Sequence, residues 1–140
     1  MKNLYYSIWV DAILRIKENP LRKEDWKWMS QIIIATFMSL NIVFFQFVLI
    51  TLGVLDKFFM LDINWFKVEK LNNLISYFTL YILPFLLLNY VLIFHKYKYK
   101  ELIKIYPYKE GKWIANYVYF SAGSVLLYIF VTFLWVMYQS

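Results

Sequence analysis

The sequence has no cysteine, one histidine, and only three glycines and three prolines in 140 residues. Without cysteine the chain forms no disulfide, thiolate metal site or thioester-linked lipid anchor. His95, the single imidazole, stands at the edge of an apolar run, which favours an interface residue over a metal ligand or a general base. We therefore expect no catalytic residue, no cofactor and no metal site.

Charge is missing from the three longest apolar runs of the chain, none of which contains Asp, Glu, Lys, Arg or His. Ionisable side chains within the membrane are typical of proton relays, ion pathways and intramembrane catalysis. Their absence argues against a proton-coupled transporter and against an aspartyl intramembrane protease. The sequence thus predicts a protein that is not an enzyme.

Hydrophobic residues make up 62% of the chain, which exceeds what a soluble domain of this size can bury. The apolar runs cover residues 29–55, 71–94 and 114–138, and each is long enough to cross a bilayer as a helix. Pro84 lies in the middle of the second run and predicts a kink there. We expect an all-α integral membrane protein, one domain over residues 1–140, with three transmembrane helices.

Residues 1–18 predict an amphipathic helix ahead of the first span. A helical projection separates an apolar face from a polar face that carries Asp11. We favour an interfacial helix lying at the lipid headgroups, and the alternative is that the apolar face packs against the protein's own segments. The apolar face holds Tyr5, Ile8, Trp9, Ala12, Ile13 and Ile16, and the polar face holds Asn3, Ser7, Asp11, Arg15 and Glu18.

Positive charge alternates between the two sides of the expected membrane. The segment before the first span has six Lys or Arg, the connection 56–70 has three, the connection 95–113 has six, and the last two residues have none. Because positive loops stay in the cytoplasm, we expect a multi-pass protein of the bacterial inner (cytoplasmic) membrane. Its N-terminus and basic connection would be cytoplasmic, and its C-terminus would lie outside.

The two connections differ in character. Connection 56–70 balances three lysines against three acids and is rich in Phe, Met and Trp, so we expect a short interfacial helix or, as an alternative, a docking surface. Connection 95–113 interleaves lysine with tyrosine, and directly after a span this pattern favours lipid headgroups or a cytoplasmic partner over nucleic acid. Its candidate contact residues are Lys96, Lys98, Lys100, Lys104, Lys109 and Lys112.

Small and polar residues recur at helical spacing within each apolar run. In lipid, small residues let helix backbones approach closely, and amide or hydroxyl side chains can hydrogen-bond across the contact. A polar stripe can instead line a path or bond back to its own helix. The candidate helix–helix or partner contacts are Ala35, Ser39, Gln46, Gly53, Asn72, Ser76, Thr79, Ser121, Gly123 and Ser124.

These patterns favour a small non-enzymatic accessory or scaffold subunit of a larger inner-membrane protein assembly. One alternative is a homo-oligomeric pore or membrane-disrupting effector, whose polar stripes would line a lumen. Another is a membrane anchor that recruits a cytoplasmic partner through the basic loop 96–112. The expected partners are membrane lipids and either other integral membrane subunits or further copies of the chain.

Overall fold

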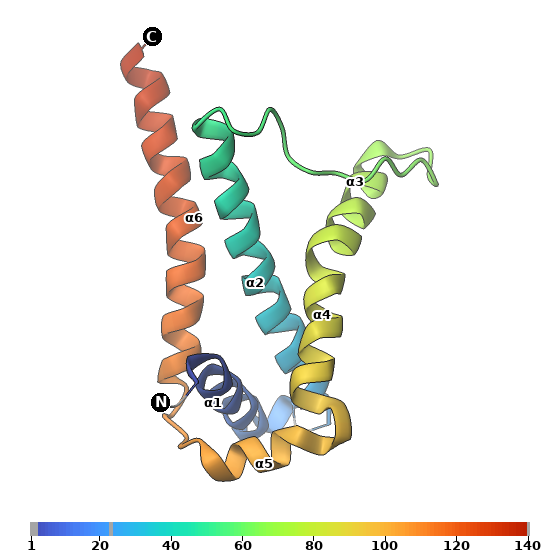
Figure 1. The fold of residues 1–140 in the computed structure, drawn as a ribbon, viewed down its shortest axis with the longest axis vertical. Helices are drawn as coiled ribbons and strands as arrows, with labels where there is room; N and C mark the ends of the chain where they lie inside the picture. Colours follow the sequence, from blue (N-terminus) through green and yellow to red (C-terminus); the bar gives the residue numbers. More distant parts are fainter. Residues whose placement is uncertain (1–2, 23, 140) are drawn as a thin grey trace.

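The computed structural model describes residues 3–22 and 24–139, and every regular element within them is helical (Figure 1). Lys2 and Lys23, which contribute to the charge count above, lie outside the described residues. The elements are α1 (Leu4–Glu18), η1 (Pro20–Arg22), α2 (Trp26–Thr51), α3 (Glu69–Tyr77), η2 (Phe78–Ile82), α4 (Leu83–Asn89), η3 (Tyr90–Phe94), η4 (His95–Tyr97), α5 (Lys98–Ile105) and α6 (Lys112–Gln139).

Three helices are long and apolar enough to cross a membrane: α2, α6 and the helical run over residues 69–94, which joins α3, η2, α4 and η3. The expected all-helical class with three spanning-length helices is therefore confirmed. The helices also begin or end close to the predicted positions, because the length of an uncharged apolar run is enough to locate a span.

The spanning helices are arranged around α2, which contacts both α6 and the run 69–94 (Figure 1). Helices α2 and α6 run in the same direction, away from the end of the molecule where α1 and α5 lie. The run 69–94, which comes between them in the sequence, runs in the opposite direction. We call the end with α1 and α5 the base, and the opposite end, where α2 and α6 finish, the far end.

The hydrophobic core lies at the base and surrounds α1. Residues 9–13 are all buried, and because five residues exceed one helical turn, the middle of α1 is enclosed on every side. In the middle of this helix, the side chains therefore pack against the protein's own segments, which was the alternative to an interfacial helix. The core consists of Trp9, Val10, Ala12 and Ile13 of α1, Ile34 of α2, Ile93 and Phe94 of η3, and Tyr99 and Leu102 of α5.

Helix α1 has side-chain signals at both ends. The Oδ1 atom of Asn3 accepts a hydrogen bond from the backbone N–H of Tyr5 at 3.0 Å, which caps the first turn. Asn19 follows the last residue, and its Oδ1 accepts from the N–H of Leu21 at 3.0 Å, which opens the single turn of η1. Polar turn residues thus stop α1 and lead the chain into α2.

The second spanning helix departs from regular α geometry at the predicted kink. Leu83 donates its backbone N–H to the carbonyl of Phe78, five residues back, so a π-helical turn lies immediately before Pro84. Proline has no N–H to continue the α pattern, and a π turn is one way to absorb that loss. The run ends after Phe94, because Lys96 and Tyr97 take left-handed φ angles of 51° and 58°.

The connection between α2 and α3 is extended, so the expectation of a short helix there is wrong. Residues 52–68 cross the far end from α2 to α3 without forming a helix (Figure 1). Side chains from the spanning helices bind this segment's backbone and hold it extended. Gly53, which the sequence placed inside the first span, lies just after α2 with a φ of 71°, in the turn that ends the helix.

Candidate functional site

Most of the polar residues predicted to contact other helices are bound within the chain. The hydroxyl groups of Ser39 and Tyr77 lie 3.1 Å apart, and Tyr81 donates to the Oε1 of Gln46 at 2.9 Å. Ala35, Ser39 and Gln46 are buried where α2 faces the run 69–94. Asn41 also donates to the hydroxyl of Tyr117 at 3.1 Å, which links α2 to α6.

Four polar side chains bind the backbone of the extended connection, and one of them is Tyr81, whose hydroxyl lies 2.6 Å from the carbonyl oxygen of Phe59. Ser76 accepts from the N–H of Leu61 at 2.7 Å, and Gln46 accepts from the N–H of Phe59 at 3.3 Å. Asn72 pairs with both the N–H and the carbonyl of Phe66, at 3.0 and 2.9 Å. Asn72 and Ser76 therefore hold a loop in place, and Thr79, one turn further on, is partly exposed.

On α6, the small-residue cluster is divided between the inside and the outside of the molecule. Ser121 is fully buried. The hydroxyl of Ser124 bonds back to the carbonyl of Ser121 at 3.1 Å. Gly123 is exposed, and a Cβ added there would meet no atom within 4 Å. A partner contact at these residues stays a prediction, and Gly123 is the one that is open to such a partner.

The outward face of α6 is the least covered part of the spanning helices. Only 6% of the residues in its most apolar stretch are buried, against 22% in α2 and 28% in the second spanning helix. Gly123 lies on this face between large exposed side chains, with Tyr119 and Phe120 before it and Leu126 and Leu127 after it. The face therefore has a notch at Gly123, bordered by bulky residues.

Asp11 holds the base together, and the sequence did not reveal this role. Its carboxylate is fully buried and accepts four backbone N–H bonds, from Lys109, Gly111, Trp113 and Ile114, at 2.8–3.2 Å. Trp113 and Ile114 belong to the first turn of α6, whose N–H groups have no partner within the helix. The carboxylate of α1 thus caps α6 at its positive end.

The six lysines of the basic connection are all exposed, but they do not form one cluster. Lys98 lies over the ring of Tyr6 at 5.7 Å, and Lys112 pairs with Glu110 at 3.8 Å. Lys104 and Lys109 line none of the cavities described below. Lys96 lies in the bend at residues 96–97, where the second spanning helix turns into α5, and the ammonium of Lys100 lies 5.0 Å from the centre of the Tyr97 ring.

A basic pocket of about 320 Å³ opens beside this bend. Helix α2 contributes Lys27 and Gln31, and the bend contributes Lys96. The Gln31 side chain is 6% exposed and has no hydrogen-bond partner among the described residues. The remaining lining residues are aromatic: Tyr90, Phe94, Tyr97 and Tyr99.

Two lysines from outside the basic connection strengthen the charge near this pocket. The ammonium of Lys17 lies 4.1 Å from the centre of the Trp26 ring, and that of Lys27 lies 5.7 Å from both Trp26 and Tyr99. Burial, and then the nearby charges of Lys27 and Lys100, lower the pKa of Lys17. Lys17 and Lys27 are not among the contact residues predicted from the sequence. Lys27 could have been predicted as a headgroup contact, because it lies between Trp26 and Trp28 at the start of an apolar run.

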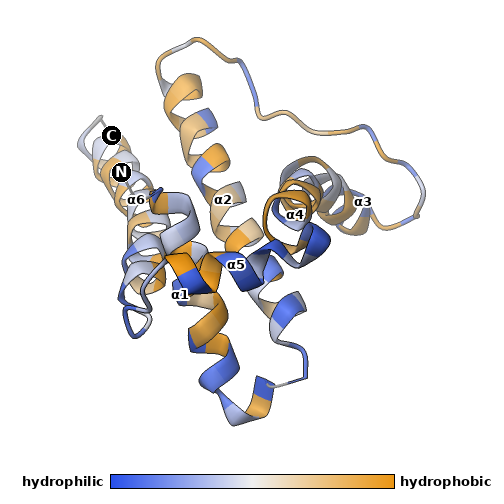
Figure 2. Ribbon diagram, turned by 60° about the horizontal axis from the view of Figure 1, so that its bottom comes forward, coloured by the Kyte–Doolittle hydropathy of each residue, from blue (hydrophilic) through white to orange (hydrophobic). Residues whose placement is uncertain are grey.

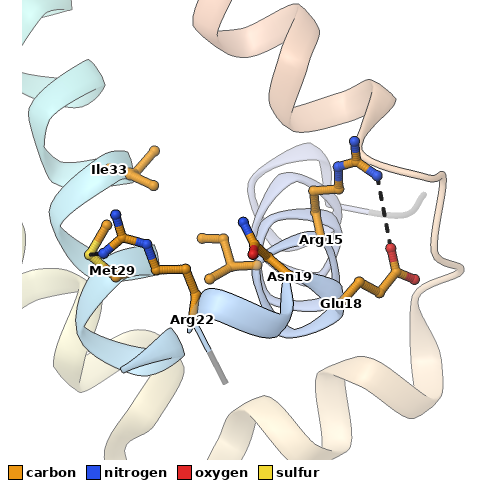
Figure 3. Close-up of a pocket in the computed structure, with 7 residues that line it drawn as sticks. Arg15, Glu18, Asn19, Arg22, Met29 and Ile33 are labelled. Carbon is orange, nitrogen blue, oxygen red and sulfur yellow. Dashed lines mark hydrogen bonds and ion pairs between the residues drawn. The ribbon is translucent and has the colours of Figure 1, made fainter. Parts of the chain in front are cut away.

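A larger pocket of about 510 Å³ lies between the end of α1 and α2, where Figure 3 shows Arg22 beside Met29 of α2 and Arg15 beside Glu18. Both arginines have contacts within the chain: Arg15 pairs with Glu18 at 4.0 Å, and Arg22 contacts the neutral sulfur of Met29 at 3.5 Å. Glu18 places a negative charge in the lining of this larger pocket, whereas no acid lines the basic pocket. The larger pocket is therefore the weaker candidate for binding an anion.

Hydrophilic residues gather at the base, on α5 and around the turn that follows α1, whereas the spanning helices are mostly hydrophobic (Figure 2). Among residues 3–22 and 24–139, no three His, Asp or Glu side chains come together in a way that could hold a metal ion. No family model, curated protein or solved structure matches this chain.

Proposed function

We propose that this chain is a non-enzymatic accessory subunit of a larger inner-membrane protein assembly. In this proposal the chain crosses the membrane three times, with α1 and α5 at the level of the cytoplasmic headgroups. Three apolar helices of sufficient length support the crossings, and the excess of Lys and Arg at the base supports the orientation. The extended connection and the C-terminus would then lie on the outer side.

The exposed outward face of α6 is the observation that supports a partner protein. A helix that faces only lipid gains nothing from a glycine in its interior, because glycine destabilises a helix by about 0.5–1 kcal/mol relative to alanine. Gly123 nevertheless lies bare on this face, with large side chains on both sides of it. In membranes, a small residue of this kind lets another helix approach closely.

The occupant that fits is a transmembrane helix of a different integral membrane subunit. Such a helix would place a ridge of side chains into the notch at Gly123, and its contact would cover Tyr119 and Leu127. The pore alternative loses support, because a lumen needs free polar side chains. Ser39, Asn41 and Gln46 instead bond to tyrosines of their own chain.

The test is a mild-detergent pull-down from native membranes with the tagged chain and two matched variants. Gly123→Leu fills the notch where the chain itself has open space, so the fold is retained and the partner is lost. Thr132→Leu is the control, because Thr132 is exposed on the opposite face of α6, about two and a half turns further on.

We expect membrane proteins in a fixed ratio to co-purify with the wild type and with Thr132→Leu, and to be absent with Gly123→Leu. Retention of the same proteins by Gly123→Leu would contradict the proposed contact. Purification of the chain alone as a discrete multimer would contradict the accessory-subunit proposal and would indicate a homo-oligomer.

A further inference from the structure

The basic pocket is formed by a sharp bend between two elements. The second spanning helix reaches the base at Phe94. Helix α5 starts at Lys98 and runs across the base. Between them, Lys96 and Tyr97 take left-handed φ angles, each of which costs a non-glycine residue about 1–2 kcal/mol. Both side chains line the pocket, to which α2 contributes Lys27.

Within the part of the chain that the structure describes, the positive charge of the pocket is not paired with an acid. Among the described residues, neither Lys27 nor Lys96 forms an ion pair, and no acidic residue lines the pocket. Lys17 and Lys100 add two more ammonium groups nearby, held against Trp26 and Tyr97. Four cations gathered without an acid favour an anionic ligand.

Gln31 independently indicates a ligand. The amide atoms of Gln31 are not sealed from solvent, so they are open to a ligand that enters the pocket. The Gln31 side chain lines the pocket, is 94% buried, and has no partner among the described residues. Its NH₂ group would donate to an acceptor placed between Lys27 and Lys96.

We infer that this pocket binds the phosphate of an anionic phospholipid. The two ammonium groups and the Gln31 amide supply donors, and phosphate oxygens supply acceptors. The pocket lies at the start of α2, beside Trp26 and Trp28, which is where headgroups would be in the proposed membrane orientation. A volume of about 320 Å³ accommodates a headgroup rather than a whole lipid.

An exposed apolar track favours a lipid over a free phosphate ion. Leu83, Leu87 and Val91 are exposed along the second spanning helix and lead toward Tyr90 at the mouth of the pocket. Acyl chains could lie along these residues while the headgroup enters the pocket. A free phosphate would make no use of this track.

The experiment measures binding of short-chain phosphatidylglycerol to the purified full chain in detergent by native mass spectrometry. The double variant Lys27→Gln/Lys96→Gln removes both charges from the pocket. Lys104→Gln/Lys109→Gln is the matched control, because it makes the same charge change at two exposed lysines outside the pocket. Circular dichroism checks that both variants keep their helical content.

We expect one phosphatidylglycerol to bind the wild type and the control with affinities within about twofold of each other. The pocket variant should bind about ten- to thirty-fold more weakly, since two cations next to the anion are lost. Gln31→Leu should also weaken binding, with no change in charge. Phosphatidylcholine, which has no net charge, should bind less tightly than phosphatidylglycerol.

Three results would overturn the inference. Equal weakening in both double variants would show that overall charge, and not the pocket, attracts the lipid. Equal binding of phosphatidylcholine would remove the requirement for an anionic lipid. Displacement of phosphatidylglycerol by an equal concentration of inorganic phosphate would assign the pocket to the free ion. Gly123→Leu, on α6, should leave lipid binding unchanged, so this inference can fail independently of the proposed partner.

Discussion

The base and the far end of this protein are built in different ways. At the base, a turn of α1 is enclosed on all sides, and Asp11 ties α1 to the start of α6. At the far end, α6 extends with its side chains exposed, and an extended segment joins α2 to α3. In this chain the base supplies most of the packing that fixes the fold, and the far end leaves apolar surface available for lipid or another protein.

The largest expected effect is the loss of the Asp11 carboxylate. Asp11→Ala leaves four N–H groups at the base without their acceptor and should lower the free energy of unfolding by about 3–5 kcal/mol. Asp62→Ala, at an exposed acid of the far connection that accepts from Asn64, should change it by less than about 0.5 kcal/mol. Denaturant titration in detergent micelles measures both, and equal effects would remove the distinction between the two ends.

A cavity in the core around α1 should have the next largest effect. Ile13 is fully buried, so Ile13→Ala should cost about 2–4 kcal/mol through lost contacts and the space left behind. Leu134 on α6 is 49% exposed, and Leu134→Ala should cost less than about 0.5 kcal/mol. The same titration compares the pair, and a larger loss for Leu134→Ala would place the packed region at the far end.

A smaller, pH-dependent effect is expected at Tyr5. Its hydroxyl donates to the Oδ1 of Asn89 at 2.8 Å, and burial raises the pKa of Tyr5 to about 12. Because the pKa is raised on folding, this stabilisation is complete below the unfolded pKa of about 10 and is lost as the pH rises through about 12. Tyr5→Phe should lose about 1–2 kcal/mol near neutral pH, since Asn89 is left without its donor.

Melting curves of the wild type and Tyr5→Phe between pH 7 and pH 12 test this expectation. The other tyrosines ionise in both proteins, so only the difference between the two curves reports Tyr5. That difference should shrink above about pH 10. A constant difference up to pH 12 would show that Tyr5 does not titrate as its buried contact requires.

The spanning helices were predictable because one local property decides them. An uncharged apolar run of sufficient length forms a helix that is long and apolar enough to span a membrane, and the predicted runs 29–55, 71–94 and 114–138 match the observed helices within a few residues. The amphipathic pattern of residues 1–18 likewise predicted α1. The pattern could not show that α1 lies within a core.

The contacts of polar residues were harder to predict, because many of their partners are backbone atoms far away in the sequence. Helical projection put Asp11 on a solvent-facing side, yet its partners are N–H groups about 100 positions later, which have no side-chain signature. In the same way, Asn72 and Ser76 have the spacing of a helix–helix contact but bind the extended connection. The spacing of residues in the sequence shows which side of a helix they share, but it does not show which segment packs against that side.

The most direct test of the proposed function is site-specific photo-crosslinking in native membranes at position 119, which borders the notch and leaves Gly123 in place, with position 132 as the comparison. If α6 docks on another subunit, a crosslinker at position 119 should give one protein adduct of defined mass, and a crosslinker at position 132 should not give that adduct. Lipid adducts alone at both positions would contradict the account, because the notch at Gly123 would then face only the bilayer.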